Sequence, residues 1–377
     1  MNEDRIMTNN KRKFISPKDI NDILRTVVYP GGKQDIVSMD MVQEIRITGR
    51  NVSFSLVFQR SDDPNQKALI LACENRLLEE LGMDLGIRGN ISVKAVHQME
   101  RPVLPGVRNI IAIASGKGGV GKSTVSVNLA VALAKTGARV GLIDADIYGP
   151  SVPKMFGVEG AHPVGEKIEG REVIVPVEKY QVKMLSIGFF VDQEEAIVWR
   201  GPMASNALKQ LITDGGWGEL DYLLIDLPPG TSDIHLTLVQ TVPVTGAVIV
   251  TTPQDVALAD VVKGVNMFKS KTIDVPVIGL VENMSWFTPE ELPEHKYYIF
   301  GEGGGKKLAD KIGLPLLGQI PLVQGIREGG DNGIPAAVDE SSLMGKAFYD
   351  LAAQTIRQVE LRNATHDPSH KVKISRK

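Results

Sequence analysis

The sequence is nearly without cysteine, since Cys73 is the single one in 377 residues. A disulfide framework within the chain is therefore excluded, and so is a metal cluster held by several cysteines of one chain. Neither sign of charge is in large excess: 42 lysines and arginines face 45 aspartates and glutamates, and the formal net charge is −3. This balance argues against a chain-wide attraction to nucleic acid or to an anionic membrane.

Long apolar runs are also missing. No stretch reaches the roughly 18 apolar residues of a membrane span, and residues 1–14 contain no apolar core of the kind found in a secretory signal. We therefore expect a cytoplasmic location. The 43% hydrophobic content supplies material for a core, and the length favours about two domains. The 38 glycines are clustered, which indicates sites built from backbone.

The first part of the chain predicts a small α+β domain over residues 14–98. Ser16 and Pro17 are typical of a helix start, and alternating apolar residues further on are typical of half-buried strands. Residues 99–108 are rich in proline and glycine and are interpreted as a linker. The expected elements are a helix from Pro17, a hairpin over 41–48 and 52–58, a helix over 66–81 and a strand over 91–95.

After residue 108 the pattern changes to near-continuous apolar runs with helical stretches between them. Such runs are typical of strands buried on both faces, and their alternation with helices predicts an α/β fold with a mainly parallel, doubly wound sheet over 109–362. Residues 166–187 are interpreted as a hairpin excursion, and residues 363–377 as a polar, basic, solvated tail. The expected strands begin near 109, 140, 222, 247, 277 and 314, and the expected helices cover 123–135, 203–213, 255–269 and 303–312.

The strongest motif is GKGGVGKST at residues 116–124, which fits G-x-x-x-x-G-K-[ST] between an expected strand and an expected helix. Glycines allow consecutive backbone N–H groups to point at phosphate oxygens, and the start of the helix adds positive potential. Lys122 is expected to bridge the β- and γ-phosphates of a nucleotide, and the Ser123 hydroxyl to bind Mg²⁺. The predicted nucleotide-binding residues of this loop are Gly116, Lys117, Gly118, Gly119, Val120, Gly121, Lys122, Ser123 and Thr124.

Carboxylates follow two other expected strands. Asp144 and Asp146 end one strand in DADIYGPS, and Asp226 ends another in YLLIDLPPG. Because the strand ends of an open parallel sheet face the ligand crevice, Asp226 is predicted to hold Mg²⁺ or its water. One carboxylate of the other pair can orient the attacking water. The residues alone leave both Asp144 and Asp146 as candidates for that role.

The extra lysine in K-G-G-x-G-K-[ST], Lys117, resembles the deviant phosphate loop of the signature-lysine ATPases. In that superfamily this lysine reaches the nucleotide of the facing subunit, so the resemblance implies a nucleotide-bridged homodimer. It implies Lys117, Lys122 and Asp146 as catalytic residues, with Asp146 preferred over Asp144. It also implies that Asn283, at the end of a later strand, contacts the adenine base.

Six further segments narrow the resemblance to the Mrp/ApbC-type iron–sulfur cluster carrier ATPases, over about residues 105–360. Residues 14–98 resemble the small MIP18-type domain often fused in front, and DIVSMDMV (35–42) carries that match. The family implies ATP and Mg²⁺ as ligands, an iron–sulfur cluster as cargo, and apoproteins and iron–sulfur assembly proteins as partners. The six segments are DIYGPSVPKMFG (146–157), WRGPM (199–203), DLPPGTSD (226–233), TTPQDVAL (251–258), VENMS (281–285) and GQIPL (318–322).

The chain departs from that family at its cysteines. Family members usually carry C-x-x-C shortly after VENMS, and here residues 285–305 (SWFTPEELPEHKYYIFGEGGG) contain no cysteine. The small domain often has Cys-Pro after its second strand, where Asp63-Pro64 stands here. Thiolates are the usual ligands of such clusters. The side chains available in their place are poor substitutes, namely Glu290, Glu291 and His295.

Cys73 shares an apolar helical stripe with Leu69, Leu77 and Leu81, which predicts a small buried hydrophobe. The alternative, in which Cys73 of two subunits supplies two ligands, stays open.

Three functions compete. The first is an ATP-hydrolysing carrier or assembly factor for iron–sulfur clusters. The second is a dimeric switch ATPase that positions macromolecules in division or partition, which usually needs a membrane helix or a basic DNA-binding surface. The final helix has the pattern of a core helix and only residues 370–377 are basic, so no nucleic acid or membrane partner is expected. The third is a scaffold in which ATP stabilises a dimer, against which both candidate catalytic carboxylates argue.

Overall fold

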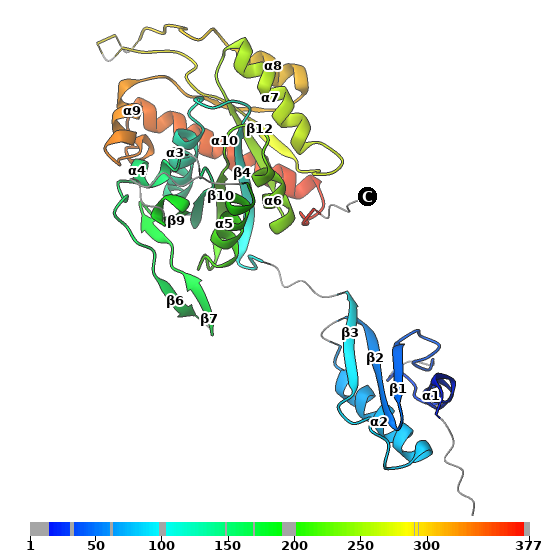
Figure 1. The fold of residues 1–377 in the computed structure, drawn as a ribbon. Helices are drawn as coiled ribbons and strands as arrows, with labels where there is room; N and C mark the ends of the chain where they lie inside the picture. The colour runs from blue at the N-terminus through cyan, green and yellow to red at the C-terminus, as the bar shows by residue number, and fades with distance from the viewer. Residues whose placement is uncertain are drawn as a thin grey trace, which may run out of the picture. The chain divides into compact units, whose positions relative to one another are not determined.

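The computed structural model describes residues 15–30, 34–60, 63–97, 103–147, 149–168, 170–190, 201–289, 291–292 and 294–372. The chain forms two compact units, residues 1–101 and residues 102–377 (Figure 1). The boundary lies within the segment interpreted as a linker, whose last two residues already belong to the first strand of the second unit.

The small unit is a three-stranded sheet, in the order β1-β2-β3, with two helices. Strands β1 and β2 form the expected antiparallel hairpin, and β3 pairs parallel to β2 after the α2 crossover. The Ser16 side chain accepts from the Asp19 N–H while the Asp19 carboxylate accepts from the Ser16 N–H, which caps the first helix. The elements are α1 (Pro17–Leu24), β1 (Val42–Thr48), β2 (Asn51–Arg60), α2 (Gln66–Leu81) and β3 (Ile91–His97).

The large unit is built on an eight-stranded sheet in the order β13-β12-β11-β4-β10-β5-β9-β8. All neighbouring pairs are parallel except β8 with β9 at one edge. The fold class expected from the alternation of strands and helices is confirmed. The strands are β4 (Val107–Ser115), β5 (Val140–Asp144), β8 (Val177–Lys179), β9 (Val182–Ser186), β10 (Leu220–Asp226), β11 (Gly246–Thr251), β12 (Val277–Glu282) and β13 (Leu316–Gln319).

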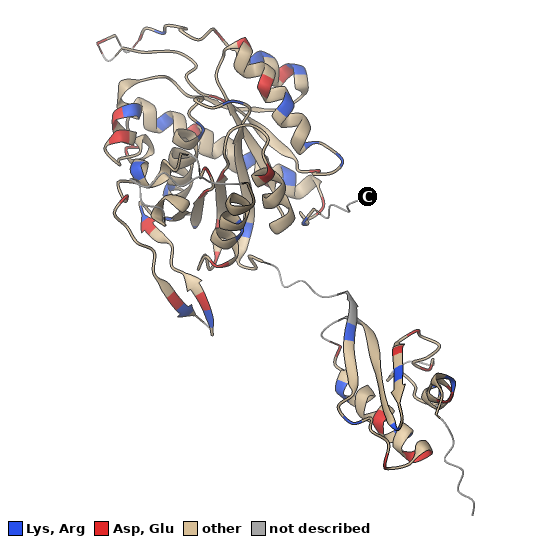
Figure 2. Ribbon diagram, in the orientation of Figure 1, with Lys and Arg blue, Asp and Glu red and all other residues tan. Residues whose placement is uncertain are grey.

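Helices cover both faces of this sheet and create two apolar cores. Along β4, Ile110 and Ala112 belong to the core under α5, α6, α7 and α8, whereas Ile111 and Ile113 belong to the core under α3 and α10. This explains why the strands are continuous apolar runs. Figure 2 shows both signs of charge along α8 and α9. The helices are α3 (Lys122–Lys135), α4 (Val152–Phe156), α5 (Gly201–Thr213), α6 (Asp233–Thr241), α7 (Asp255–Phe268), α8 (Gly304–Ile312), α9 (Gln324–Asp331) and α10 (Leu343–Thr365).

Two expectations need correction. Strands β6 (Gly165–Ile168) and β7 (Arg171–Ile174) form the expected hairpin, but β9 is a parallel strand of the main sheet beside β5. Lys183, the second residue of β9, interrupts the apolar run that would have indicated a strand buried on both faces. The Lys183 ammonium donates to the Trp217 carbonyl (3.3 Å). The segment after residue 362 is not simply a solvated tail. Helix α10 continues to Thr365, and the Val372 N–H donates to the Val239 carbonyl (2.9 Å).

In the part of the chain that the structure describes, no helix is long and apolar enough to cross a membrane.

Candidate nucleotide site

The glycine-rich loop joins the carboxyl end of β4 to the start of α3. Gly119 and Gly121 have positive φ angles, 80° and 77°, which residues with a side chain rarely adopt. A Cβ on Gly121 would lie 2.2 Å from the Asn283 amide nitrogen, so this position needs glycine for two reasons. The first N–H groups of α3 have no partner within the helix and can therefore bind an anion.

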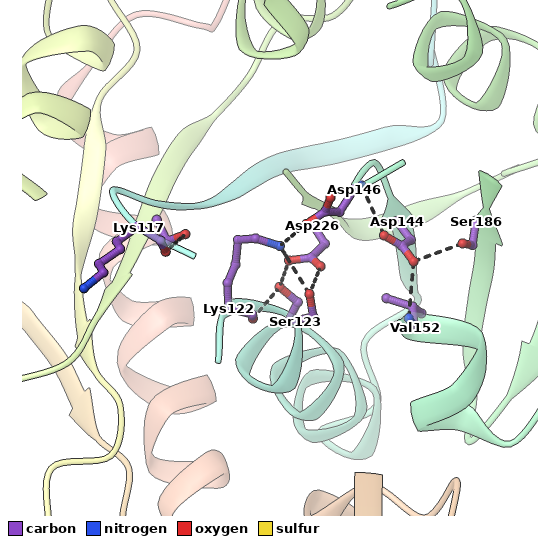
Figure 3. Close-up of polar contacts among 10 residues, drawn as sticks. Lys117, Lys122, Ser123, Asp144, Asp146, Val152, Ser186 and Asp226 are labelled. Atoms are coloured by element: carbon purple, nitrogen blue, oxygen red, sulfur yellow. Dashed lines mark hydrogen bonds and ion pairs between the residues drawn. The ribbon is translucent and has the colours of Figure 1, made fainter. Parts of the chain in front are cut away.

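Lys122 and Asp226 form a buried ion pair beneath the loop (Figure 3). The Lys122 ammonium lies 2.9 Å from the Asp226 carboxylate at the end of β10, with the lysine 6% exposed and the aspartate fully buried. The hydroxyls of Ser123 and Ser126 donate to the two oxygens of the same carboxylate, and each hydrogen bond is 2.6 Å long. Sequence reasoning missed Ser126; its position one turn after Ser123, on the same face of α3, was the available signal.

Ser123 and Asp226 together offer a hydroxyl and a carboxylate at one point. Mg²⁺ prefers such hard oxygen ligands and is held in nucleotide sites by one or two protein groups together with phosphate oxygens. The predicted magnesium ligands therefore fit the ion by their chemistry and by their contact with each other.

Asp144 and Asp146 lie in different surroundings. Asp144 is fully buried, and it accepts from the Ser186 hydroxyl (3.0 Å) and the Val152 N–H (3.2 Å). The pKa of Asp144 is raised to about 7, mainly by burial and to a smaller extent by the nearby Asp226 carboxylate. It ties β5 to β9 and α4. The Asp146 side chain is 16% exposed, and its carboxylate lies 3.9 Å from the Lys122 ammonium. Asp146 is thus the one of the two with access to solvent.

The other predicted residues are arranged around the loop. Lys117 is exposed, and its side chain points away from the buried carboxylates (Figure 3). Asn283 is buried, and its amide donates to the Val120 carbonyl (2.8 Å), which ties the end of β12 to the loop. The predicted contact of Asn283 with adenine stays a prediction, as does the reach of Lys117 into a second subunit.

The loop between β10 and α6, residues 227–232, contacts the end of β4 next to the phosphate loop, and a buried histidine holds its last residue. The Gly230 N–H donates to the Ser115 carbonyl (2.9 Å). His235, in the first turn of α6, accepts from the Ser232 N–H (3.2 Å) through Nδ1. Its Nε2 is buried and has no hydrogen-bond partner among the described residues. Burial lowers the pKa of His235 to about 4, so its ring is neutral at physiological pH.

The candidate cluster ligands that the structure describes differ in their surroundings. Cys73 is 0% exposed in the core of the small unit, and burial raises the pKa of its thiol to about 12. This matches the prediction of a small buried hydrophobe. Glu290 lies outside the described residues, and Glu291 and His295 are exposed. Within the described ranges, no three His, Cys, Asp or Glu side chains are grouped to hold a metal ion.

A parallel α/β sheet, a glycine loop between β4 and α3, and a buried lysine paired with an aspartate on the adjacent strand define a P-loop NTPase. Residues 106–356 match the family described as the NUBPL iron-transfer P-loop NTPase. Because this match spans more than half of the chain, the protein belongs to that family. Residues 17–82 match a second family, described as iron–sulfur cluster assembly protein. Both matches confirm the resemblance found in the sequence.

Individual relatives agree with the family. An iron–sulfur cluster carrier protein of Synechocystis is 44% identical over 343 residues, which are 90% of this chain and 96% of that protein. A carrier protein of the same name from Pseudomonas fragi is 52% identical over 262 residues, 69% of this chain and 89% of its own. A solved nucleotide-binding protein from Archaeoglobus fulgidus, in complex with ADP, is 38% identical with a TM-score of 0.53, covering 61% of this chain and 88% of its own.

Proposed function

We propose that the protein binds and hydrolyses ATP and that it uses this cycle to carry iron–sulfur clusters to apoproteins. The observation that supports the ATP half is the contact of Lys122 and Ser123 with Asp226 directly beneath the glycine loop. The names of the Synechocystis and Pseudomonas fragi relatives support the cargo.

In this proposal the buried groups exchange partners when nucleotide binds. Lys122 turns from Asp226 to the β- and γ-phosphates. Ser123 and Asp226 would hold Mg²⁺, which would neutralise phosphate charge. Asp146, within reach of the same lysine, orients the attacking water. Phosphoryl transfer needs positioning and charge stabilisation more than covalent chemistry, and these residues supply both.

We further propose a homodimer, with the exposed Lys117 completing the site of the partner subunit, and a cytoplasmic location. The side chain of Lys117 points away from its own carboxylates, as a residue acting on a second subunit would. Apoprotein clients and assembly proteins are the expected partners.

An anaerobic transfer assay tests the function. The purified chain, a preformed cluster, glutathione and an inactive cluster-dependent enzyme are mixed with and without ATP and Mg²⁺, and the recovered enzyme activity is followed. We expect ATP to change the rate of recovery for the wild type and for Lys306→Ala, an exposed lysine on α8, but not for Lys122→Ala. A recovery rate that the chain and ATP leave unchanged would contradict the proposal.

A further inference from the structure

We infer that this chain handles an iron–sulfur cluster only together with thiolates from a second molecule, which complete the ligand set that the chain lacks. The inference rests on the proposed function and deepens it, because it names the chemistry of the partner.

The chain's own thiol is in the wrong place. Iron–sulfur clusters are held mainly by cysteine thiolates. Cys73, the single cysteine of the sequence, lies on the inner face of α2 between Leu69 and Leu77, and all three are at most 1% exposed. To bind iron, Cys73 would have to leave this core and lose a proton that burial holds with a pKa of about 12.

The same placement answers the alternative in which two subunits each offer one Cys73. The Cys73 thiol belongs to the buried core of the small unit, which also contains Ile20 of α1 and Phe54 and Leu56 of β2. A cluster between two subunits could reach it only if the small unit opened. A cysteine pair across a dimer is therefore not available to the folded chain.

The segment that follows Asn283 is occupied by aromatic packing. Phe287 and Tyr297 exchange backbone hydrogen bonds of 2.8 and 2.9 Å, and their rings lie 6.5 Å apart. The Lys296 ammonium lies 3.9 Å from the centre of the Trp286 ring. Apart from Lys296 and two tyrosines, the ionisable side chains in the sequence of this segment are carboxylates and a single imidazole, and hard carboxylate oxygens match iron–sulfur chemistry poorly.

One further imidazole is no substitute. His235 has a buried Nε2 without a hydrogen-bond partner among the described residues, but the ring is 1% exposed and packs near Phe268. It cannot reach a cluster on the surface.

The missing ligands must then be thiolates of a low-molecular-weight thiol or of a partner protein's cysteines. The step is ligand exchange without a change of oxidation state. Each thiol loses its proton to the buffer as its sulfur–iron bond forms, and the weaker ligand that it displaces leaves with its own electron pair.

A loading experiment distinguishes the two sources. The full chain is incubated anaerobically with ATP, Mg²⁺, a mixture of ferrous and ferric iron, and sulfide, with no added thiol or other reductant. One sample has no addition, one has glutathione, and one has a small cysteine-ligated apoprotein. Iron and sulfide eluting with the chain in gel filtration are then measured. We expect at least about tenfold more of both in one of the two thiol samples than in the thiol-free sample.

Variants separate ligation from packing. Cys73→Ala should load as the wild type does in every sample, and Leu77→Ala, which removes a neighbouring buried side chain, is the packing control; Cys73→Val serves if Cys73→Ala does not fold. Full loading of the wild type without thiol would overturn the inference. The inference would also be overturned if the Cys73 variants, but not Leu77→Ala, lost the loading seen for the wild type, or if the wild type failed to load in every sample. ATP hydrolysis, measured in the same samples without iron, tests the nucleotide half of the proposed function separately.

Discussion

Replacing Lys122 should reduce the stability of the fold as well as nucleotide binding. In Lys122→Ala the fully buried Asp226 loses the cation that lies 2.9 Å away, and Asp144 loses the positive charge that lowers its pKa. Two buried carboxylates then share one site without a neutralising charge. This situation is unfavourable because an ionised group in an apolar interior lacks the stabilisation that water provides.

The structure sets the size of the effect. Removing one partner of a buried ion pair costs about 3–5 kcal/mol of unfolding free energy. We expect a loss of about 3 kcal/mol here, since the Ser123 and Ser126 hydroxyls still hold Asp226 and Asp144 can take up a proton. A charge-assisted contact with phosphate is worth about 1.5–3 kcal/mol. Lys122 must break its ion pair with Asp226 before it binds phosphate, so we expect the binding free energy to fall by the lower value, about 1.5 kcal/mol. This corresponds to about a tenfold loss of ATP affinity.

The stability loss should depend on pH. The pKa of Asp144 lies above the value of about 3.9 expected in the unfolded chain, so the folded state holds more protons. The contribution of such a group is present below the unfolded pKa and is lost as pH rises through the folded one. Without Lys122 the folded pKa rises further. The deficit of Lys122→Ala should therefore be larger at about pH 8 than at about pH 6.

Urea unfolding without added nucleotide measures the stability, and calorimetry measures ATP affinity. Lys306→Ala is the control for removal of an exposed lysine. The double variant Lys122→Ala/Asp226→Asn removes the unpaired charge and should be more stable than Lys122→Ala alone. Equal stability of Lys122→Ala and wild type at about pH 8, or a double variant less stable than the single one, would refute the buried pair.

Three further predictions concern neighbouring residues. Asp146→Asn should keep ATP affinity and lose hydrolysis by about 10²–10⁴-fold, the usual contribution of a positioned base; normal hydrolysis would shift the role to Asp144. Lys117→Ala should bind ATP nearly normally but lose ATP-driven dimerisation, and mixing it with Asp146→Asn protein should restore part of the hydrolysis if the lysine acts on the partner subunit. His235, whose pKa of about 4 lies below the unfolded value of about 6.5, should cost stability as pH falls between these values. His235→Asn, which keeps an acceptor for the Ser232 N–H, should lose less stability over that range. If urea unfolding showed the same loss of unfolding free energy with falling pH for both proteins, this prediction would be contradicted.

Much of the architecture could be predicted from the sequence because its signals are local. The α2 helix has the expected bounds, 66–81, since Gly82 follows with a φ of 100° that ends a helix. Buried parallel strands were visible as apolar runs because each residue along them meets one of two cores. The glycine loop carries its chemistry in consecutive residues, so its position between strand and helix followed directly.

The tertiary structure alone decided which groups meet. Lys122 and Asp226 are more than a hundred residues apart in the chain and touch because β10 pairs with β4, an adjacency that periodicity does not encode. The same holds for Asp144 and Ser186, which meet because β9 joins the sheet beside β5. Burial at this meeting point separates the roles of Asp144 and Asp146, since exposure and pKa depend on what packs around a carboxylate and not on its position in a motif.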